Sequence, residues 1–352
     1  MSGGNGISGG TLYAFLLEFG SPIGYFTPKN EQQGRQLSLW IKLRTQLEMK
    51  REEIHIARPL LVIFLLTALF VQGCLTAAKQ NLPLNTRPPR IALVLGGGSS
   101  RGFAHIGVIR VLEQEKIPVD MIVGTSVGSL IGAIYAANPN SFELEWLAFE
   151  LEKDDIFDFS ILSSKTGPVK GNKLEKFVTE HIKIHNIEEM KIPYYAMACD
   201  LNTGESVVLD KGPVELAVRA SASIPGIFTP LNINNRILVD GGVNGSIAPE
   251  TAREKGADIV IAVNIGKDIT NYETGNIIQI TLQAIDIMGK RIDEYKNRQA
   301  DILIEPEVGN VGTMDFSKKK ELMVAGIEAG QKAIPAIRAA IEKWYATPVA
   351  QR

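Results

Sequence analysis

The chain has 352 residues, of which 45% are apolar and 22% charged, and its formal net charge is -2. This balance is typical of a globular protein with one large α/β domain plus extensions, or with two ordinary domains. A charge close to zero, with no strongly basic block, argues against a nucleic-acid partner. Only two cysteines occur, so a disulfide framework is excluded as well.

The N-terminal part contains a long apolar run. Residues 59–78 include no charged side chain, and the cationic residues Lys50, Arg51 and Arg58 precede them. A positive segment followed by an apolar run is typical of an export signal. The run continues through the sequence VQGC at Cys74, which resembles a bacterial lipobox except for its glutamine. We therefore expect a bacterial lipoprotein that is lipidated at Cys74 and held at a membrane. The alternative is an uncleaved transmembrane anchor, because about 20 uncharged residues just span a bilayer.

Four parts are expected along the chain. Residues 1–48 begin with the glycine-rich MSGGNGISGG. We expect them to be a flexible extension, or a segment included because the start codon was misplaced. Residues 49–74 form the signal or membrane anchor. Residues 75–89 form a linker, because they are rich in proline and asparagine. The folded domain is expected at residues 90–345.

Short apolar runs alternate with helical patterns from Ile91 onward. Strands are expected at 91–95, 120–126, 194–201, 206–210, 236–240, 258–265 and 301–308. Helices are expected at 102–115, 127–138, 173–184, 214–221, 249–254, 277–298 and 319–345. This alternation indicates a mostly parallel sheet with helices on both faces, so the predicted fold is a three-layer α/β/α sandwich.

The second expected strand is followed by the turn Gly124-Thr125-Ser126-Val127-Gly128. Its place between a strand and a helix is that of a hydrolase nucleophile elbow. Glycines at Gly124 and Gly128 allow a sharp turn, which exposes the Ser126 hydroxyl beside a helix N-terminus, where negative charge is stabilised. An ordinary strand-to-helix turn is the alternative interpretation.

The first expected strand is followed by another glycine-rich turn, Gly96–Gly102, which resembles a phosphate-binding loop. A dinucleotide site also needs an acidic residue at the end of the second strand, and a P-loop needs a lysine; both are missing. The backbone N–H groups of the turn, with Arg101 beside them, suit a small oxyanion. Since a nucleophile elbow follows, we expect an oxyanion hole, with a nucleotide-binding protein as the alternative.

Histidine, the usual base of a catalytic triad, is scarce in this chain. The chain has four histidines, and none follows His185, whereas the α/β-hydrolase order places the histidine last. A carboxylate base would remove the need for one. Asp240 ends an apolar strand and is followed by Gly241 and Gly242, so it is the candidate; a turn-capping aspartate is the alternative. His181 and His185 have the spacing of a metal pair but lack a third ligand, so no metal site is expected.

Four blocks of sequence, in this order over about residues 90–267, resemble the motifs of the patatin-like phospholipases. They are LVLGGGSSRGFAHIGVIRVLEQ, GTSVGSLIGAIYA, RASASIPGIFTPL and LVDGGV. The resemblance implies a three-layer sandwich and a Ser–Asp dyad that works without histidine. It implies Ser126 as the nucleophile and Asp240 as the general base. It also implies that the N–H groups of Gly97 and Gly98 form the oxyanion hole, with Arg101 supporting the loop.

The same resemblance implies hydrolysis of lipid acyl esters through an acyl-enzyme, without a metal or organic cofactor. The expected partner is a membrane lipid or another acyl ester, and the sequence leaves the particular substrate and the oligomeric state open. This chain has Ser99 where the family usually has glycine, which is expected to distort the turn if that residue needs a positive φ. A catalytically inactive membrane-anchored scaffold is the alternative. The stretch SASIPGIF at residues 221–228 resembles the family's segment beside the active site, and we expect it to contribute core packing rather than substrate contact. Cys199 is expected to be a buried core residue.

Overall fold

The computed structural model describes residues 34–36, 38–47, 49, 85–158, 169–266, 269–270, 275, 277–312 and 315–347. The chain divides into two compact units, Met1–Leu82 and Pro83–Arg352. In the first unit, residues 34–36, 38–47 and 49 are helical. Among the residues so described, no helix combines the length and the apolar character that crossing a bilayer requires. Cys74 and the apolar run around it lie outside the described residues.

The second unit is built on an eight-stranded mixed sheet in the order β5-β6-β3-β2-β1-β7-β8, with β4 paired to β3. The strands are β1 (Ile91–Leu95), β2 (Met121–Thr125), β3 (Tyr194–Asp200), β4 (Ser206–Leu209), β5 (Leu231–Ile233), β6 (Arg236–Asp240), β7 (Ile259–Val263) and β8 (Ile302–Ile304). Strands β3, β2, β1, β7 and β8 are parallel to their neighbours in this series. By contrast, β4 and β6 run antiparallel to β3, and β5 runs antiparallel to β6. The mostly parallel sheet predicted from the sequence is confirmed, with one antiparallel edge.

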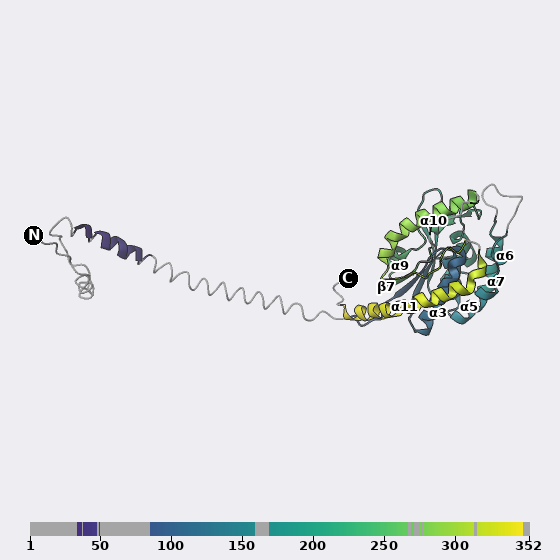
Figure 1. Cartoon of the computed structure of the whole chain (residues 1–352), viewed down its shortest axis with the longest axis horizontal. Helices are drawn as coiled ribbons and strands as arrows, with labels where there is room; N and C mark the ends of the chain where they lie inside the picture. The colour runs from purple at the N-terminus through teal and green to yellow at the C-terminus, as the bar shows by residue number, and fades with distance from the viewer. Residues whose placement is uncertain are drawn as a thin grey trace, which may run out of the picture. The chain divides into compact units, whose positions relative to one another are not determined.

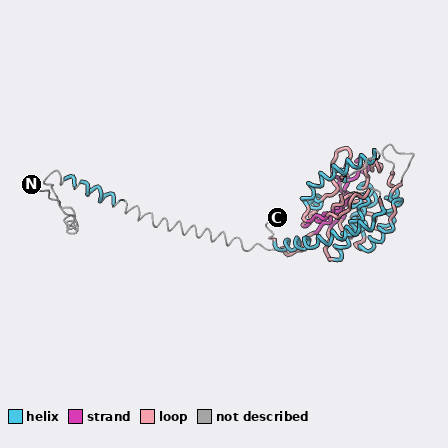
Figure 2. The backbone as a smooth tube through the Cα atoms, in the orientation of Figure 1, coloured by secondary structure: helices cyan, strands magenta, loops and turns pink. Residues whose placement is uncertain are grey.

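Helices cover both faces of the sheet, as Figures 1 and 2 show. They are α3 (Phe103–Gln114), α4 (Val127–Ala137), α5 (Ser141–Glu150), α6 (Lys153–Ile156), α7 (Asn172–His181), α8 (Val214–Ser221), α9 (Pro249–Glu254), α10 (Ile277–Lys296) and α11 (Lys319–Ala346). Short 3-10 helices occur at η1 (Ser99–Gly102), η2 (Ile187–Glu189), η3 (Gly241–Asn244), η4 (Asn297–Gln299) and η5 (Phe316–Lys318). The predicted three-layer α/β/α sandwich is therefore confirmed.

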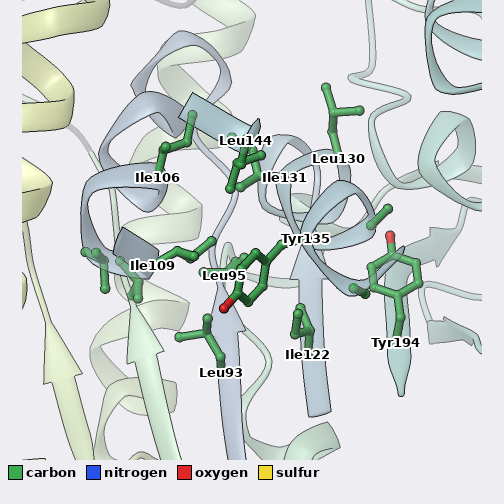
Figure 3. Close-up of a cluster of buried hydrophobic side chains, with 14 of the residues drawn as sticks. Leu93, Leu95, Ile106, Ile109, Ile122, Leu130, Ile131, Tyr135, Leu144 and Tyr194 are labelled. Atoms are coloured by element: carbon green, nitrogen blue, oxygen red, sulfur yellow. The ribbon is translucent and has the colours of Figure 1, made fainter. Parts of the chain in front are cut away.

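Two hydrophobic cores lie on opposite faces of the sheet, because successive side chains of a strand point to opposite sides. Ile91, Leu93 and Leu95 of β1 belong to the larger core, which α3, α4 and α11 complete; Figure 3 shows part of it. Ala92 and Val94 of the same strand belong to a smaller core that is completed by α9. Because both faces of β1 are covered, its apolar residues form an uninterrupted run, as in other buried parallel strands.

Some elements differ from those predicted. Helices α5 and α6 and strand β5 were not expected from the sequence. Strand β8 ends at Ile304, whereas the apolar pattern extended it to Val308. Pro306 explains the earlier end, because proline has no N–H to donate to a neighbouring strand.

Candidate active site

Ser126 lies in a sharp turn between β2, which ends at Thr125, and α4, which begins at Val127. Its backbone has φ 55° and ψ -123°, a conformation that residues other than glycine rarely adopt. Hydrogen bonds hold it there. The Ser126 N–H donates to Ser221 Oγ at 3.0 Å, and the Ser126 carbonyl accepts from the Ser129 N–H at 2.9 Å. Strained residues of this kind persist where the surrounding structure fixes them, which is common at functional sites.

The glycines on either side of Ser126 are required by close packing. A Cβ atom at Gly128 would lie 2.2 Å from the Leu95 carbonyl oxygen, and one at Gly124 would lie 2.5 Å from Ser129 Cα. Both distances are far below a van der Waals contact. The turn therefore has no room for a side chain at either position, which gives the Gly-x-Ser-x-Gly spacing a steric cause.

Asp240 reaches Ser126 through the register of the strands. Asp240 at the end of β6 pairs with Ala198 of β3, and Thr125 at the end of β2 pairs with Met197 of the same strand. Ser126 follows Thr125 and therefore lies at the height of Ala198 on one side of β3. Asp240 lies at the same height on the other side of β3. Asp240 ends its strand as the sequence predicted, and that strand, β6, runs antiparallel to β3. The position of Asp240 results from the short overlap of β6 with β3.

The Asp240 carboxyl group is buried, and its environment makes it more basic than an ordinary aspartate. Burial raises its pKa from 3.8 to about 6, although hydrogen bonds from the Ser126 side chain and the Gly242 N–H partly oppose this. The bond from the Gly242 N–H to Asp240 Oδ1 measures 2.7 Å. Gly241 is needed for packing, since a Cβ there would lie 2.6 Å from the Met197 carbonyl oxygen. A carboxylate that ionises near pH 6 beside a serine hydroxyl can accept its proton.

The glycine-rich turn after β1 lies against Ser126, because a Cβ atom at Gly97 would be 3.3 Å from Ser126 Cβ. The Gly97 N–H donates to the Ser246 carbonyl oxygen at 2.9 Å in this structure. The expectation that Gly97 supplies an oxyanion donor stays a prediction, and it requires this bond to be shared or broken. The Gly98 N–H has no acceptor among the described residues, and Gly98 lines the same cavity as Ser126.

The next residue of the turn, Ser99, has φ 52°. The position therefore takes the left-handed conformation that favours glycine, at a cost of about 1–2 kcal/mol for a residue with a side chain. Arg101 supports the loop from within the protein. Its Nε donates to the Ile265 carbonyl at 2.9 Å and its Nη1 to the Val311 carbonyl at 3.3 Å. Ser100 Oγ adds a bond of 2.7 Å to the Gly312 carbonyl.

Two hollows of different character meet at Ser126. A polar cavity of about 340 Å³ contains Ser126 and Asp240 and is walled by charged and polar residues of α10. An apolar pocket of about 80 Å³ lies on the other side of Ser126. Its lining includes Phe103, Leu130, Ile131, Leu144, Leu147 and Phe177. Ser99, Ser126 and Ile224 line both hollows.

Several residues of the site were not identified from the sequence. Ser221 fixes the Ser126 N–H, and Ser246 occupies the Gly97 N–H. Residues 221–228 were expected to serve core packing rather than substrate contact, but Ile224 and Pro225 of that segment line the polar cavity. The four-block resemblance, which placed this segment beside the active site, was the available signal. Cys199 is buried, as expected.

None of the described histidines lines the cavity that holds Ser126. His105 is fully buried, its Nε2 lies 2.8 Å from the Gly96 carbonyl oxygen, and burial lowers its pKa to about 4. His181 is the last residue of α7 and stacks on Phe177, whereas His185 lies beyond the helix. The described residues contain no cluster of side chains that could hold a metal ion.

A strained serine at a strand–turn–helix elbow, next to a buried carboxylate and a backbone N–H donor, defines a serine hydrolase type of site on an α/β/α sandwich. Residues 93–252 match the family model of the patatin-like phospholipases. This part of the chain is therefore similar to the patatin-like phospholipases.

Known proteins similar to this chain match it over part of their own length. An uncharacterised NTE family protein of Mycobacterium tuberculosis is 34% identical over 177 residues, which is 50% of this chain and 49% of the relative. A lysophospholipase of Meyerozyma guilliermondii is 27% identical over 266 residues, 67% of this chain and 18% of the relative. The crystal structure of VipD from Legionella pneumophila aligns with a TM-score of 0.42 and 12% identity, covering 74% of this chain and 70% of that one. The chain thus spans about half the length of the mycobacterial relative it matches.

Proposed function

We propose that this chain is a serine acyl hydrolase that cleaves acyl esters of lipids, with Ser126 as the nucleophile and Asp240 as the general base. The observation that carries the proposal is that the strained Ser126 and the buried Asp240 carboxyl group line the same cavity, where burial raises the pKa of Asp240 to about 6. The similarity to the patatin-like phospholipases supports it, as does a relative that is named a lysophospholipase.

In the first half of the reaction, Asp240 takes the proton of the Ser126 hydroxyl while Oγ attacks the ester carbonyl carbon. The carbonyl oxygen becomes an oxyanion, which the Gly98 N–H and the positive end of α4 stabilise. The tetrahedral intermediate collapses, the bond to the alcohol oxygen breaks, and the alcohol leaves with the proton from Asp240. An acyl group remains on Ser126.

In the second half, Asp240 accepts a proton from water, which attacks the acyl carbon of the acyl-enzyme. The same N–H donor stabilises the second oxyanion. Collapse then breaks the bond to Ser126 Oγ, which recovers its proton from Asp240, and the fatty acid departs. Every proton is taken up and returned by Asp240, so the cycle needs no histidine and no metal.

The two hollows that meet at Ser126 support a lipid as the substrate. The apolar pocket suits an acyl chain, because its lining is aliphatic and aromatic. The polar cavity suits a headgroup, because Lys290, Asp286 and Glu305 line it and offer charges of both signs. An ester bond between a chain and a headgroup would then lie beside Ser126. We therefore place phospholipids and lysophospholipids first among the candidate substrates.

The test is release of fatty acid by the full chain from p-nitrophenyl esters and from phospholipid vesicles. Ser126→Ala and Asp240→Asn are expected to reduce the rate to background while circular dichroism stays unchanged. The matched controls Ser206→Ala on β4 and Asp210→Asn directly after it change the same residue types away from the cavity, and should keep the wild-type rate. Full activity of Ser126→Ala, or no activity of the wild type on any ester, would refute the proposal.

We also propose that residues 49–74 hold the protein at a membrane, through a lipid on Cys74 or as a transmembrane anchor. The support is the pattern of charged and apolar residues in the sequence. The test is incorporation of labelled fatty acid into the full chain and into Cys74→Ala during bacterial expression. Lipidation at Cys74 predicts a label in the wild type alone, whereas membrane association without any label indicates the transmembrane alternative.

A further inference from the structure

Helix α10 turns several polar side chains toward the protein. Figure 1 shows the helix at the outer edge of the domain. Asp293 and Gln283 are only 5% and 8% exposed, although both are polar. Asp293 Oδ1 accepts the Ser246 N–H at 2.8 Å, Gln283 Nε2 donates to the Ile269 carbonyl at 3.0 Å, and Lys296 pairs with Glu250 at 2.6 Å.

The opposite side of α10 exposes four large apolar side chains, with Arg291 among them. Ile280, Ile287, Met288 and Tyr295 are 48%, 42%, 57% and 69% exposed. Their spacing of seven, eight and fifteen residues from Ile280 places them along one face of a helix. A helix on the surface of a soluble domain ordinarily has the reverse arrangement, with its apolar stripe on the core and its polar residues outside.

The inward side of α10 is also a wall of the reactive cavity. Leu282, Ile285 and Gly289 line the polar cavity that contains Ser126 and Asp240. Any body that covers the outward stripe is therefore separated from that cavity by a single helix, about 10 Å across. A surface that contacts the stripe would therefore lie close to the cavity that substrate must enter.

We propose that the outward stripe of α10, defined as Ile280, Ile287, Met288 and Tyr295, rests on the surface of a lipid bilayer. This proposal rests on the proposed function in one respect: a lipid-cleaving enzyme makes a lipid surface the expected binding partner of the stripe. A row of aliphatic side chains with a tyrosine, bordered by cations, is the composition of helices that lie in a membrane interface. The exposed charged residues of α10 are Lys290, which also lines the polar cavity, and Arg291 and Glu294, which form an ion pair at 3.3 Å; together they leave one excess positive charge.

The size of the stripe argues against a second copy of the chain as the occupant. From Ile280 to Tyr295 a helix rises about 22 Å, and at a width of about 10 Å the stripe covers roughly 200 Å². A stable dimer buries roughly 800 Å² on each partner. A bilayer needs no matching protein surface, so a narrow stripe is sufficient.

The first test places an environment-sensitive dye on the stripe of the full chain. Met288→Cys carries nitrobenzoxadiazole in a Cys74→Ser background, in which the remaining Cys199 is buried. The matched control carries the dye at Val324→Cys on α11, a position that is 43% exposed. Phosphatidylcholine vesicles, alone and with phosphatidylglycerol, are added, and co-sedimentation measures how much chain is bound.

We expect the dye at residue 288 to brighten several-fold and shift to shorter wavelength, more so with phosphatidylglycerol, while the dye at residue 324 does not respond. A chain that co-sediments without a change at residue 288 overturns the proposal, because it is then held elsewhere. An equal change at both positions, or no binding to either vesicle, overturns it too.

The second test uses activity. Met288→Glu is expected to lower hydrolysis of vesicle phospholipid several-fold and to leave hydrolysis of a soluble short-chain ester unchanged, whereas Val324→Glu alters neither. Light scattering decides about a second copy, because a wild-type dimer that Met288→Glu dissociates would assign the stripe to the dimer and overturn the proposal. If the wild type hydrolyses neither substrate, the proposed function fails while the dye measurement still decides whether α10 docks.

Discussion

Replacing Asp240 by asparagine is predicted to abolish activity and to stabilise the fold. Asparagine keeps an oxygen for the Gly242 N–H and offers an N–H to Ser126 Oγ, but it carries no buried charge. Burial raises the pKa of Asp240 from 3.8 to about 6, so ionising this group costs the folded state about 3 kcal/mol relative to the unfolded state. Removing that cost should raise the free energy of unfolding by up to this amount near pH 8.

The gain should depend on pH in a defined direction. Between pH 3.8 and about 6 the folded protein keeps a proton on Asp240 that the unfolded chain has lost, so the wild type loses stability as pH rises through this window. The advantage of Asp240→Asn should therefore fall from about 3 kcal/mol near pH 8 to about half of that near pH 5 and to less than about 1 kcal/mol near pH 4. Urea unfolding at each pH measures it.

Ser126→Ala is the control for this reasoning. It should be equally inactive, but it retains Asp240 and removes a hydrogen bond that lowers the pKa of that group. It should therefore show no gain in stability near pH 8. An Asp240→Asn protein that is no more stable than the wild type near pH 8, or whose advantage does not shrink in acid, would refute the assignment of Asp240 as a buried carboxylate with a raised pKa.

Three further predictions concern the same site. The kcat/KM for a soluble ester should rise about tenfold for each pH unit below about 6 and level off above it, because Asp240 must be ionised; a flat profile over that range would exclude Asp240 as the base. Ser99→Gly should raise the free energy of unfolding by about 1 kcal/mol, since φ at this position is 52°, and urea unfolding would contradict this with a loss. Gly128→Ala should cost about 1–3 kcal/mol and most of the activity, because its Cβ would lie 2.2 Å from the Leu95 carbonyl oxygen; an active, equally stable variant would show that the elbow is more compliant than its packing indicates.

The parts of the fold that follow from local pattern could be predicted. Strand β1 and helix α3 appeared within one or two residues of the ranges expected, because uninterrupted apolar runs and a helical period each have one simple interpretation. Helix α5 was missed because it is apolar on two faces: Leu144 and Leu147 line the pocket while Phe142 and Trp146 are exposed, so no period stands out. The direction of β6 could not be predicted, since a five-residue strand has no pattern that tells parallel from antiparallel.

The site could be predicted as a set of residue types but not as a set of contacts. The steric demands of the elbow identified Ser126, and the scarcity of histidine identified a carboxylate. The availability of one N–H rather than another depends on distant partners: the Ser246 carbonyl takes the Gly97 N–H and leaves that of Gly98. The basicity of Asp240 likewise depends on burial by segments that only the folded chain brings together.

The orientation of α10 depends on a near balance of two contributions to stability, namely the polar contacts of the helix with the domain and the burial of its apolar side chains. Burying an apolar side chain fully stabilises by about 1.5–3 kcal/mol, so four half-exposed side chains forgo about 4 kcal/mol. The bonds of Asp293, Gln283 and Lys296 to the domain stabilise by about 1 kcal/mol each. In water the observed orientation is therefore hardly more stable than one in which the apolar stripe faces the domain. An apolar surface outside would shift this balance decisively. Hydrogen exchange of α10 should therefore be fast in solution and slow several-fold on vesicles, with α3 unchanged; equal protection of α10 in both conditions would show that its contacts with the domain suffice alone.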